Sequence, residues 1–470
     1  MGRLAARTPP VQPVFHPCEH NSLAGDPGLE TGATFLSQFA NRFFVEGSLM
    51  AERATILRAM QMIRLTLFLA VAALAAAQTP GLAVWHMQES GTTAGLRGIF
   101  SVDGTVAWAS GTGGSVLRTV DGGAHWTKCA VPDAAKDGAS LDFRGVQAWD
   151  TDTAIVMASG PGDKSRLYKT TDGCKNWTLL FKNPDTPDGF FDSFWLNAIY
   201  GEGILLGDPV KGRFTVFDTA DGGVTWKRDQ SRSLRLHGLS LTAFAASNSS
   251  IGKARRGEGD TRGPGTDSFP GFVTGGRDSA FLIERWEGRS RTKARFSEGR
   301  NAAMFLLSDW NRRAIPLAAG TESAGAFAFA LRYTGSPCSD CGFGMYWHLV
   351  AVGGDYLKPN EAVGTAAYSD SDGGWTWTAS TIPPHGYRSA VQWSGALKAW
   401  ITVGTNGSDI SRDDGKTWQP LDDGNWNALS LPFVVGPNGR IARIDPAALA
   451  VPAVTKGTSD RSDSTLGTVK

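Results

Sequence analysis

Short apolar runs alternate with glycine-bearing turns along most of the chain. Runs such as Val106–Ala109 and Ala399–Val403 are four or five residues long, and each leads into a turn that contains glycine. Runs of this length, bounded by glycine, favour strands over helices. Seven such turns recur along the chain, starting at Gly111, Gly160, Gly207, Gly275, Gly353, Gly404 and Gly436. The pattern predicts repeated units of short antiparallel strands.

A second pattern has a fixed internal spacing. Five times an Asp precedes a Gly-bearing turn and a Trp stands five residues after it, in the pairs Asp121 and Trp126, Asp172 and Trp177, Asp221 and Trp226, Asp372 and Trp377, and Asp413 and Trp418. This spacing favours a hairpin, because the Asp side chain accepts turn amides, Gly takes positive φ and Trp covers the strand junction. We interpret these residues as structural, since the turns are expected at the periphery between the third and fourth strands of each unit.

A third pattern opens each unit, with a small residue directly after a variable one. The openings are Leu96–Gly98, Phe143–Gly145, Leu196–Ala198, Leu241–Ala243, Ala324–Ala326, Tyr387–Ser389 and Trp426–Ala428. A small residue suits the innermost strand of a propeller blade, because the strands converge on the axis there. The three patterns together predict an all-β fold, a seven-bladed β-propeller.

The last unit, Trp426–Ile444, offers three strands. We expect Ala83–Gln88 to supply the fourth, so that the N-terminal strand closes the ring and covers both open sheet edges. The propeller is therefore expected over residues 78–445, followed by a flexible C-terminal tail, 446–470.

Residues 1–77 are excluded from the predicted fold because they end in a secretory signal pattern. Within Met60–Ala77, Arg64 precedes an apolar stretch and a run of Ala stands before Gln78. Either translation starts at Met60 or Met62, or the leader is extended. In both cases the sequence predicts an exported protein, periplasmic or secreted, in an oxidising compartment.

Composition and cysteine content narrow the function classes. The formal net charge is +1, which gives no overall field for nucleic acid, and 58 Gly and 16 Trp fit a turn-rich repeat. Among the five Cys, Cys338 and Cys341 suggest a small loop disulfide, since a zinc site would need two further ligands. A bridge between Cys129 and Cys174 is left open. We expect no metal and no cofactor.

Three arginines share one position in their units. Arg97, Arg144 and Arg388 are each the variable residue of an opening pattern, and Asn197 and Asn427 hold the same position in two other units. A guanidinium pairs with carboxylates bidentately. The arrangement predicts an arc at the channel mouth that binds an anionic partner, such as an acidic peptide or a C-terminal carboxylate. The alternative is that each Arg bonds carbonyls of adjacent blades and ties the ring together.

A polar segment is expected beside this arc. Asp355, Tyr356, Lys358, Glu361 and His385 are predicted to widen the binding rim, or alternatively to brace a long strand connection. A sialidase-like glycoside hydrolase would need three arginines, a Tyr nucleophile with a Glu partner, and an Asp acid. Tyr356 with Glu361, and Tyr387, are the remaining candidates for that chemistry, so no catalytic residue is assigned.

The motifs resemble a known family. The five Asp-to-Trp turns, Leu96–Ile99, Ala107–Gly111, Gly353–Glu361 and the closing Gly436–Ile441 resemble those of the Asp-box, or BNR-repeat, β-propellers related to the photosystem II stability/assembly factor. A non-photosynthetic bacterial member is expected, because the leader is bacterial in type. The resemblance implies a lumenal or periplasmic factor that binds a protein subunit through an arginine-rich surface.

The expected function follows from the residue patterns and from the family resemblance together. We predict a non-catalytic, monomeric propeller that binds a protein or acidic peptide as an assembly or stability factor, with membrane association through the partner. Nucleic acid is not expected. The alternatives are a secreted sialidase-like hydrolase acting on carbohydrate and a cell-surface interaction module.

Overall fold

The computed structural model describes residues 83–131, 137, 140–197, 201–252, 271–286, 309–333, 347–370 and 374–449. Residues 82–470 form one compact unit, and the strands below all belong to it. The predicted leader, the Cys338–Cys341 loop, Asp372 and the tail beyond residue 449 lie outside the described residues.

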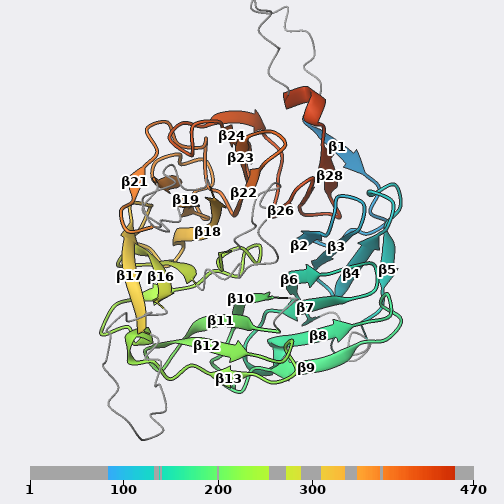
Figure 1. The fold of residues 1–470 in the computed structure, drawn as a ribbon, viewed down its shortest axis with the longest axis horizontal. Coiled ribbons are helices and arrows are strands. Elements are labelled where there is room, and N and C mark those ends of the chain that lie inside the picture. Colours follow the sequence, from blue (N-terminus) through green and yellow to red (C-terminus); the bar gives the residue numbers. More distant parts are fainter. Residues whose placement is uncertain are drawn as a thin grey trace, which may run out of the picture. The chain divides into compact units, whose positions relative to one another are not determined.

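The described chain consists almost entirely of short antiparallel strands (Figure 1). The first three sheets are β2 (Leu96–Ser101), β3 (Ala107–Gly111), β4 (Ser115–Thr119) and β5 (Thr127–Cys129); β6 (Phe143–Ala148), β7 (Ala154–Ala158), β8 (Arg166–Thr170) and β9 (Thr178–Lys182); and β10 (Phe191–Leu196), β11 (Gly203–Val210), β12 (Arg213–Thr219) and β13 (Lys227–Arg228). The last two are β22 (Ala390–Ser394), β23 (Ala399–Gly404), β24 (Gly407–Ser411) and β25 (Gln419–Asp422); and β26 (Ala428–Ser430), β27 (Phe433–Val435), β28 (Ile441–Ile444) and β1 (Trp85–Gln88).

Between these lies one eight-stranded sheet. Its strands are β14 (Leu241–Thr242), β15 (Gly271–Gly276), β16 (Ala280–Trp286), β17 (Asp309–Ile315), β18 (Ala324–Tyr333), β19 (Trp347–Asp355), β20 (Ala366–Ser369) and β21 (Thr378–Ala379). The link between β15 and β18 is the single pair Gly275 and Gly325, so the sheet divides there into β14–β17 and β18–β21. Divided in this way, the strands of the described ranges form seven four-stranded groups. Three short 3-10 helices, Gly162–Lys164, Arg232–Leu234 and Pro446–Leu449, complete the described elements.

Apolar clusters between consecutive groups hold the sheets together. Trp108 of β3 packs with Phe143 and Tyr168 of the next group, and Leu205 of β11 packs with Met157 of the group before it. Clusters of the same kind join each later pair. One further cluster joins the last group to the first, through Phe433 and Leu96. The sheets therefore pack face to face in a closed succession, as in a propeller.

The N-terminal strand completes the last sheet. Trp85 to Gln88 pair antiparallel with Ile444 to Ile441, and Figure 1 shows β1, in blue, beside β28, in red. Trp85 is buried, and its Nε1 donates a hydrogen bond to Oγ of Ser408, 2.9 Å away. The predicted all-β propeller class and its closure by the N-terminal strand are confirmed. In the part of the chain that is described, no helix is both long and apolar enough to cross a membrane.

The Asp-to-Trp turns have a common geometry. Oδ1 of Asp221 accepts the N–H of Thr225 at 2.9 Å, and Oδ1 of Asp121 accepts that of His125 at 3.0 Å. Asp172 and Asp413 make the same bond four residues ahead. The pKa of Asp121 is lowered to about 2, chiefly by the His125 N–H and side chain, and that of Asp221 to about 2, chiefly by the Thr225 hydroxyl and N–H. The four carboxylates are thus engaged within their own turns.

A disulfide joins the first two groups. Cys129 ends β5 and Cys174 lies in the turn after β8, and the two are bridged with a Cα–Cα distance of 5.5 Å. The sequence left this pairing open, because the two residues are 45 positions apart and meet only after adjacent sheets have packed.

Candidate functional site

A pocket of about 520 Å³ lies where the inner strands of several groups begin. It is lined by residues that include Arg97 of β2, Arg144 of β6, Asp192 of β10, Phe327 of β18 and Asn427 next to β26. The pocket therefore gathers residues from groups that are distant in sequence. Of the predicted arc, Arg97, Arg144 and Asn427 meet here.

A repeated bulge aims the first two arginines. The pairing register shifts between Leu96 and Gly98 in β2, and between Phe143 and Gly145 in β6, so Arg97 and Arg144 are the extra residues. A bulge re-aims one side chain relative to the rest of its strand. The small residue after it is required, because a Cβ on Gly98 would lie 2.5 Å from Oγ of Ser110.

The two guanidinium groups share one carboxylate. Nε of Arg144 donates to Oδ2 of Asp142 at 2.8 Å, and Nε of Arg97 lies 3.3 Å from the same oxygen. The side chain of Arg97 is 35% exposed and that of Arg144 27% exposed, so both remain accessible. Burial lowers the pKa of Arg97, while Asp142 raises it. Asp142 leaves one positive charge of the pair uncompensated.

An acidic wall stands beside the arginines. Asp192 of β10 and Asp208 of β11 both line the pocket, on neighbouring strands whose residues Phe191 and Gly207 pair. Asp208 accepts the Thr242 hydroxyl at 2.6 Å and the Ala243 N–H at 3.2 Å. Burial raises the pKa of Asp192 well above its ordinary value, Asp208 raises it further and Arg144 lowers it. Burial also raises the pKa of Asp208.

Sequence reasoning missed this acidic wall, although a signal was present. Phe191-Asp192-Ser193 repeats the opening pattern, and its register shift lies between Phe191 and Ser193, as in the two arginine strands. The prediction used Leu196-Asn197-Ala198 instead. That choice was wrong by five residues, because Leu196 is the last residue of β10 and Asn197 lies beyond it. Asp192 thus occupies the position expected for Asn197.

Aromatic side chains form another wall. The Phe244 and Phe327 rings stack with centroids 3.8 Å apart, and Tyr387 meets Phe327 edge-on at 4.8 Å. Tyr356 completes the group at 6.2 Å from Phe327 and is 48% exposed. The wall offers an apolar surface for the carbon chain of a ligand.

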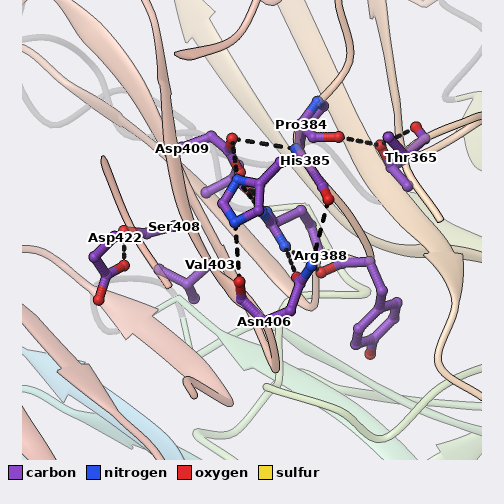
Figure 2. A network of polar contacts seen from close by, with 12 residues as sticks. Thr365, Pro384, His385, Arg388, Val403, Asn406, Ser408, Asp409 and Asp422 are labelled. Carbon is purple, nitrogen blue, oxygen red and sulfur yellow. Dashed lines mark hydrogen bonds and ion pairs between the residues drawn. The ribbon is translucent and has the colours of Figure 1, made fainter. Parts of the chain in front are cut away.

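Arg388 does not reach this pocket. Its side chain is fully buried, Nε donates to Oδ2 of Asp409 at 2.6 Å, and Nη1 donates to Oδ1 of Asn406 at 2.5 Å. Figure 2 shows the guanidinium enclosed by Asp409, Asn406 and His385. Its backbone N–H also donates to the carbonyl of Gly353, at 2.9 Å. The expected three-arginine arc is therefore corrected to a pair. The Arg388 side chain bonds residues of its own group, so it also differs from the alternative of bonding carbonyls of adjacent blades; only its backbone N–H reaches the group before it.

His385 belongs to the same buried network. Its Nε2 donates to the carbonyl of Asn406 at 2.9 Å, and its Nδ1 lies 2.8 Å from Oδ1 of Asp409 and 2.9 Å from Nη2 of Arg388 (Figure 2). The ring is thus engaged on both nitrogens. The expected role of His385 at a binding rim is replaced by a packing role.

Of the other predicted rim residues, one lines the pocket and three do not. Tyr356 lines the pocket, whereas Asp355 is buried and accepts the N–H of Leu357 at 3.0 Å. Lys358 and Glu361 are exposed and pair with each other at 3.5 Å. Asp355 therefore shapes the loop, in line with the bracing alternative. Asn427 lines the pocket and donates from Nδ2 to the carbonyl of Leu96 at 2.8 Å.

The chain is similar to known proteins in sequence and in structure. No family model matches the sequence. The chain is 28% identical over 146 residues to the Photosystem II assembly lipoprotein Ycf48 of Synechococcus sp. (strain CC9902), and the match spans 30% of this chain and 39% of that protein. The resemblance read from the motifs is confirmed as sequence similarity to Ycf48 over this part of the chain.

Two solved structures are similar as well. The structure described as YCF48 bound to D1 peptide has 16% identity and a TM-score of 0.47, covering 77% of this chain and 97% of its own. YCF48 from Cyanidioschyzon merolae has 19% identity and the same TM-score of 0.47, covering 78% of this chain and 100% of its own.

Proposed function

Starting from the sequence similarity to Ycf48, we propose that this protein is an exported assembly or stability factor that binds an anionic segment of another protein in the Arg97–Arg144 pocket. A solved YCF48 is bound to D1 peptide, which makes a peptide a reasonable class of ligand to test here. The preferred anion is a carboxylate, either at the end of a chain or on an acidic side chain.

One observation carries this proposal. Arg97 and Arg144 project from bulges on adjacent groups and converge on a single oxygen of Asp142. Two partly exposed arginine side chains with one carboxylate between them leave donor capacity for a ligand in the pocket. A ligand carboxylate can occupy those donors bidentately, and each such charge-assisted bond contributes about 1.5–3 kcal/mol.

Export is part of the same proposal. The leader pattern at Met60–Ala77 supports it, and so does the Cys129–Cys174 disulfide, because disulfides persist in oxidising compartments. The related Ycf48 is described as a lipoprotein. We infer a periplasmic, secreted or lumenal location.

The hydrolase alternative finds less support in the geometry. A tyrosine nucleophile must lose its proton, yet burial raises the pKa of Tyr387. Glu361, the proposed partner of Tyr356, pairs with Lys358 at 3.5 Å. A binding role therefore fits these residues better than sialidase-like catalysis. A cell-surface interaction module would use the same pocket and differs in its partner.

Calorimetry with defined peptides tests the proposal. The probes are an eight-residue Ala/Gly peptide with a free terminal carboxylate, its amidated form, and an amidated form with three internal Glu. We expect the free or the Glu-bearing peptide to bind, more weakly at higher salt. Arg97→Gln or Arg144→Gln should weaken binding about tenfold or more.

Arg412→Gln is the matched control, because Arg412 is exposed on a peripheral turn and bonds to carbonyls of Leu397 and Leu449. It should leave peptide binding unchanged. Equal binding of all three peptides, or a panel of fluorogenic glycosides that the wild type hydrolyses and Arg97→Gln does not, would overturn the binding-factor proposal.

A further inference from the structure

The acidic wall of the pocket contains an acceptor with no partner. Asp192 is 1% exposed and lines the pocket, and among the residues that the structure describes, none donates a hydrogen bond to its buried Oδ2. A buried polar atom without a partner costs about 1–3 kcal/mol. An oxygen of this kind at a pocket wall indicates a place for a donor from outside the chain.

A second carboxyl stands next to it. Asp208 follows Gly207, which pairs with Phe191, the residue before Asp192. The Thr242 hydroxyl and the Ala243 N–H hold the Asp208 carboxyl through Oδ1. Among the described residues, both hydrogen bonds to the Asp208 carboxyl go to Oδ1, and Asp208 lines the same pocket as Asp192.

We propose that Asp192 and Asp208 form a cation subsite that takes an ammonium or guanidinium group of the bound segment. The inference rests on the proposed function for the neighbouring carboxylate subsite. Together the two subsites select a segment that carries a Lys or Arg side chain within a few residues of the carboxylate bound by Arg97 and Arg144.

The chemistry of the wall favours an amine over a metal ion. In the described part of the chain, no cluster of three or more His, Cys, Asp or Glu side chains could hold a metal. An ammonium needs fewer ligands, because it donates up to three hydrogen bonds and pairs with carboxylates as a point charge. The stacked Phe244 and Phe327 rings in the same pocket can pack against the aliphatic stem of a Lys or Arg.

The binding of a cation at this wall is coupled to the protonation of Asp192 and Asp208. The titratable and charged groups around the acid pair are Arg97, Arg144, Asp142, Glu322, Tyr356 and Tyr387. Burial and mutual repulsion favour the neutral form of the pair, and Arg144 opposes this. An incoming ammonium favours the charged form, so its binding releases a proton. The affinity for a cationic segment is therefore expected to rise with pH, while the affinity for an uncharged analogue does not.

Matched peptides test the subsite. The probes are acetylated five-residue Ala peptides with a free terminal carboxylate and one Lys placed one, two or three residues before the end. The same peptides with norleucine in place of Lys keep the carbon chain and lack the charge. Amidated Lys peptides and calcium chloride alone complete the set. Affinities are measured by calorimetry between pH 5 and pH 8.

The expected result is that at least one Lys peptide binds about tenfold more tightly than its norleucine analogue. Asp192→Asn and Asp208→Asn should each remove this difference and its pH dependence. The substitutions are isosteric, and a cooperative thermal transition with an unchanged circular dichroism spectrum would show that each variant folds.

The outcomes separate the two proposals. Equal affinity for Lys and norleucine peptides overturns the cation subsite and leaves the carboxylate subsite standing. Equal affinity for amidated and free Lys peptides, with the Lys preference retained, overturns the carboxylate subsite and supports the acidic wall. Calcium binding lost in Asp192→Asn, without any Lys preference, would assign the wall to a metal ion and overturn the inference.

Discussion

The guanidinium of Arg388 and the carboxylate of Asp409 pair inside the protein, and neither side chain is exposed to solvent. Nε of Arg388 donates to Oδ2 of Asp409 at 2.6 Å. Arg388 lies just before β22, and Asp409 lies 21 residues later, in β24. Oδ1 of the same Asp409 accepts the backbone N–H of His385 at 3.3 Å. The pair therefore fixes the segment that leads into β22 against the middle of its own sheet.

Replacing Arg388 tests this role. Arg388→Met leaves Asp409 buried without its partner, which is expected to lower the free energy of unfolding by about 3–5 kcal/mol. The double variant Arg388→Met with Asp409→Leu should recover most of the loss, because no charge remains buried. Urea unfolding measures both. Arg97→Met is the control, since Arg97 is partly exposed. An Arg388→Met protein with wild-type stability and weakened peptide binding would return Arg388 to the binding site.

Closure of the ring provides a second test. Trp85 of β1 is 6% exposed, and its ring centroid lies 6.0 Å from that of Trp426. Trp85→Ala should lower the free energy of unfolding by about 3–5 kcal/mol, because it removes a buried indole and a hydrogen bond to Ser408. Met87 is the matched control, two residues along the same strand and 57% exposed.

Met87→Ala should change the stability by less than about 0.5 kcal/mol. Denaturation followed by tryptophan fluorescence and by circular dichroism measures both variants. If the two substitutions had equal small effects, β1 would be dispensable for the closed fold.

The fold could be predicted because its causes are local and repeated. The Asp-to-Trp spacing reports a hairpin whose hydrogen bonds, such as Asp221 to Thr225, lie within five residues. The strand Ala83–Gln88 can be assigned to the last sheet because the last unit of the sequence offers only three of the four expected strands. The pocket arginines Arg97 and Arg144 were found through the small residue that follows each of them.

The rest of the site depends on relations that no short pattern contains. Arg388 shares the opening pattern with Arg97, but its direction is decided by Asp409, 21 positions later. Asp192 was missed because Leu196-Asn197-Ala198 imitates the opening, and only the register shift after Phe191 separates the two. Periodicity places a residue on a strand, whereas a bulge or a buried partner decides where its side chain points.

The disulfide makes a third prediction. Replacing both Cys129 and Cys174 with Ser should lower the free energy of unfolding by about 4 kcal/mol, because the bridge closes a loop of 45 residues and restricts the unfolded chain. Urea unfolding of the double variant and of reduced wild-type protein measures the effect. Reductant should destabilise the wild type and leave the double variant unchanged. Equal stability of oxidised and reduced wild type would contradict the prediction.

The last prediction concerns the effect of Asp192 on how the stability of the free protein depends on pH. Burial raises its pKa well above the ordinary value of 3.8, so the folded state retains a proton that the unfolded chain loses. Between the ordinary pKa of 3.8 and the raised pKa of the folded state, the folded protein binds more protons than the unfolded one. The free energy of unfolding therefore falls as the pH rises above 3.8, by at most about 1.4 kcal/mol per pH unit, until Asp192 ionises in the folded protein. Below pH 3.8 the stabilising contribution of the Asp192 proton is fully present.

The variant Asp192→Asn carries no proton to lose, so its stability should lack this decline. Urea unfolding of wild type and variant from pH 4 to pH 8 should give curves that diverge with pH, the variant becoming relatively more stable. Asp152→Asn is the control, since the Asp152 side chain is 60% exposed. Parallel curves for wild type and Asp192→Asn would mean that Asp192 is already ionised in the folded protein. The acidic wall would then carry a negative charge before any cation arrives.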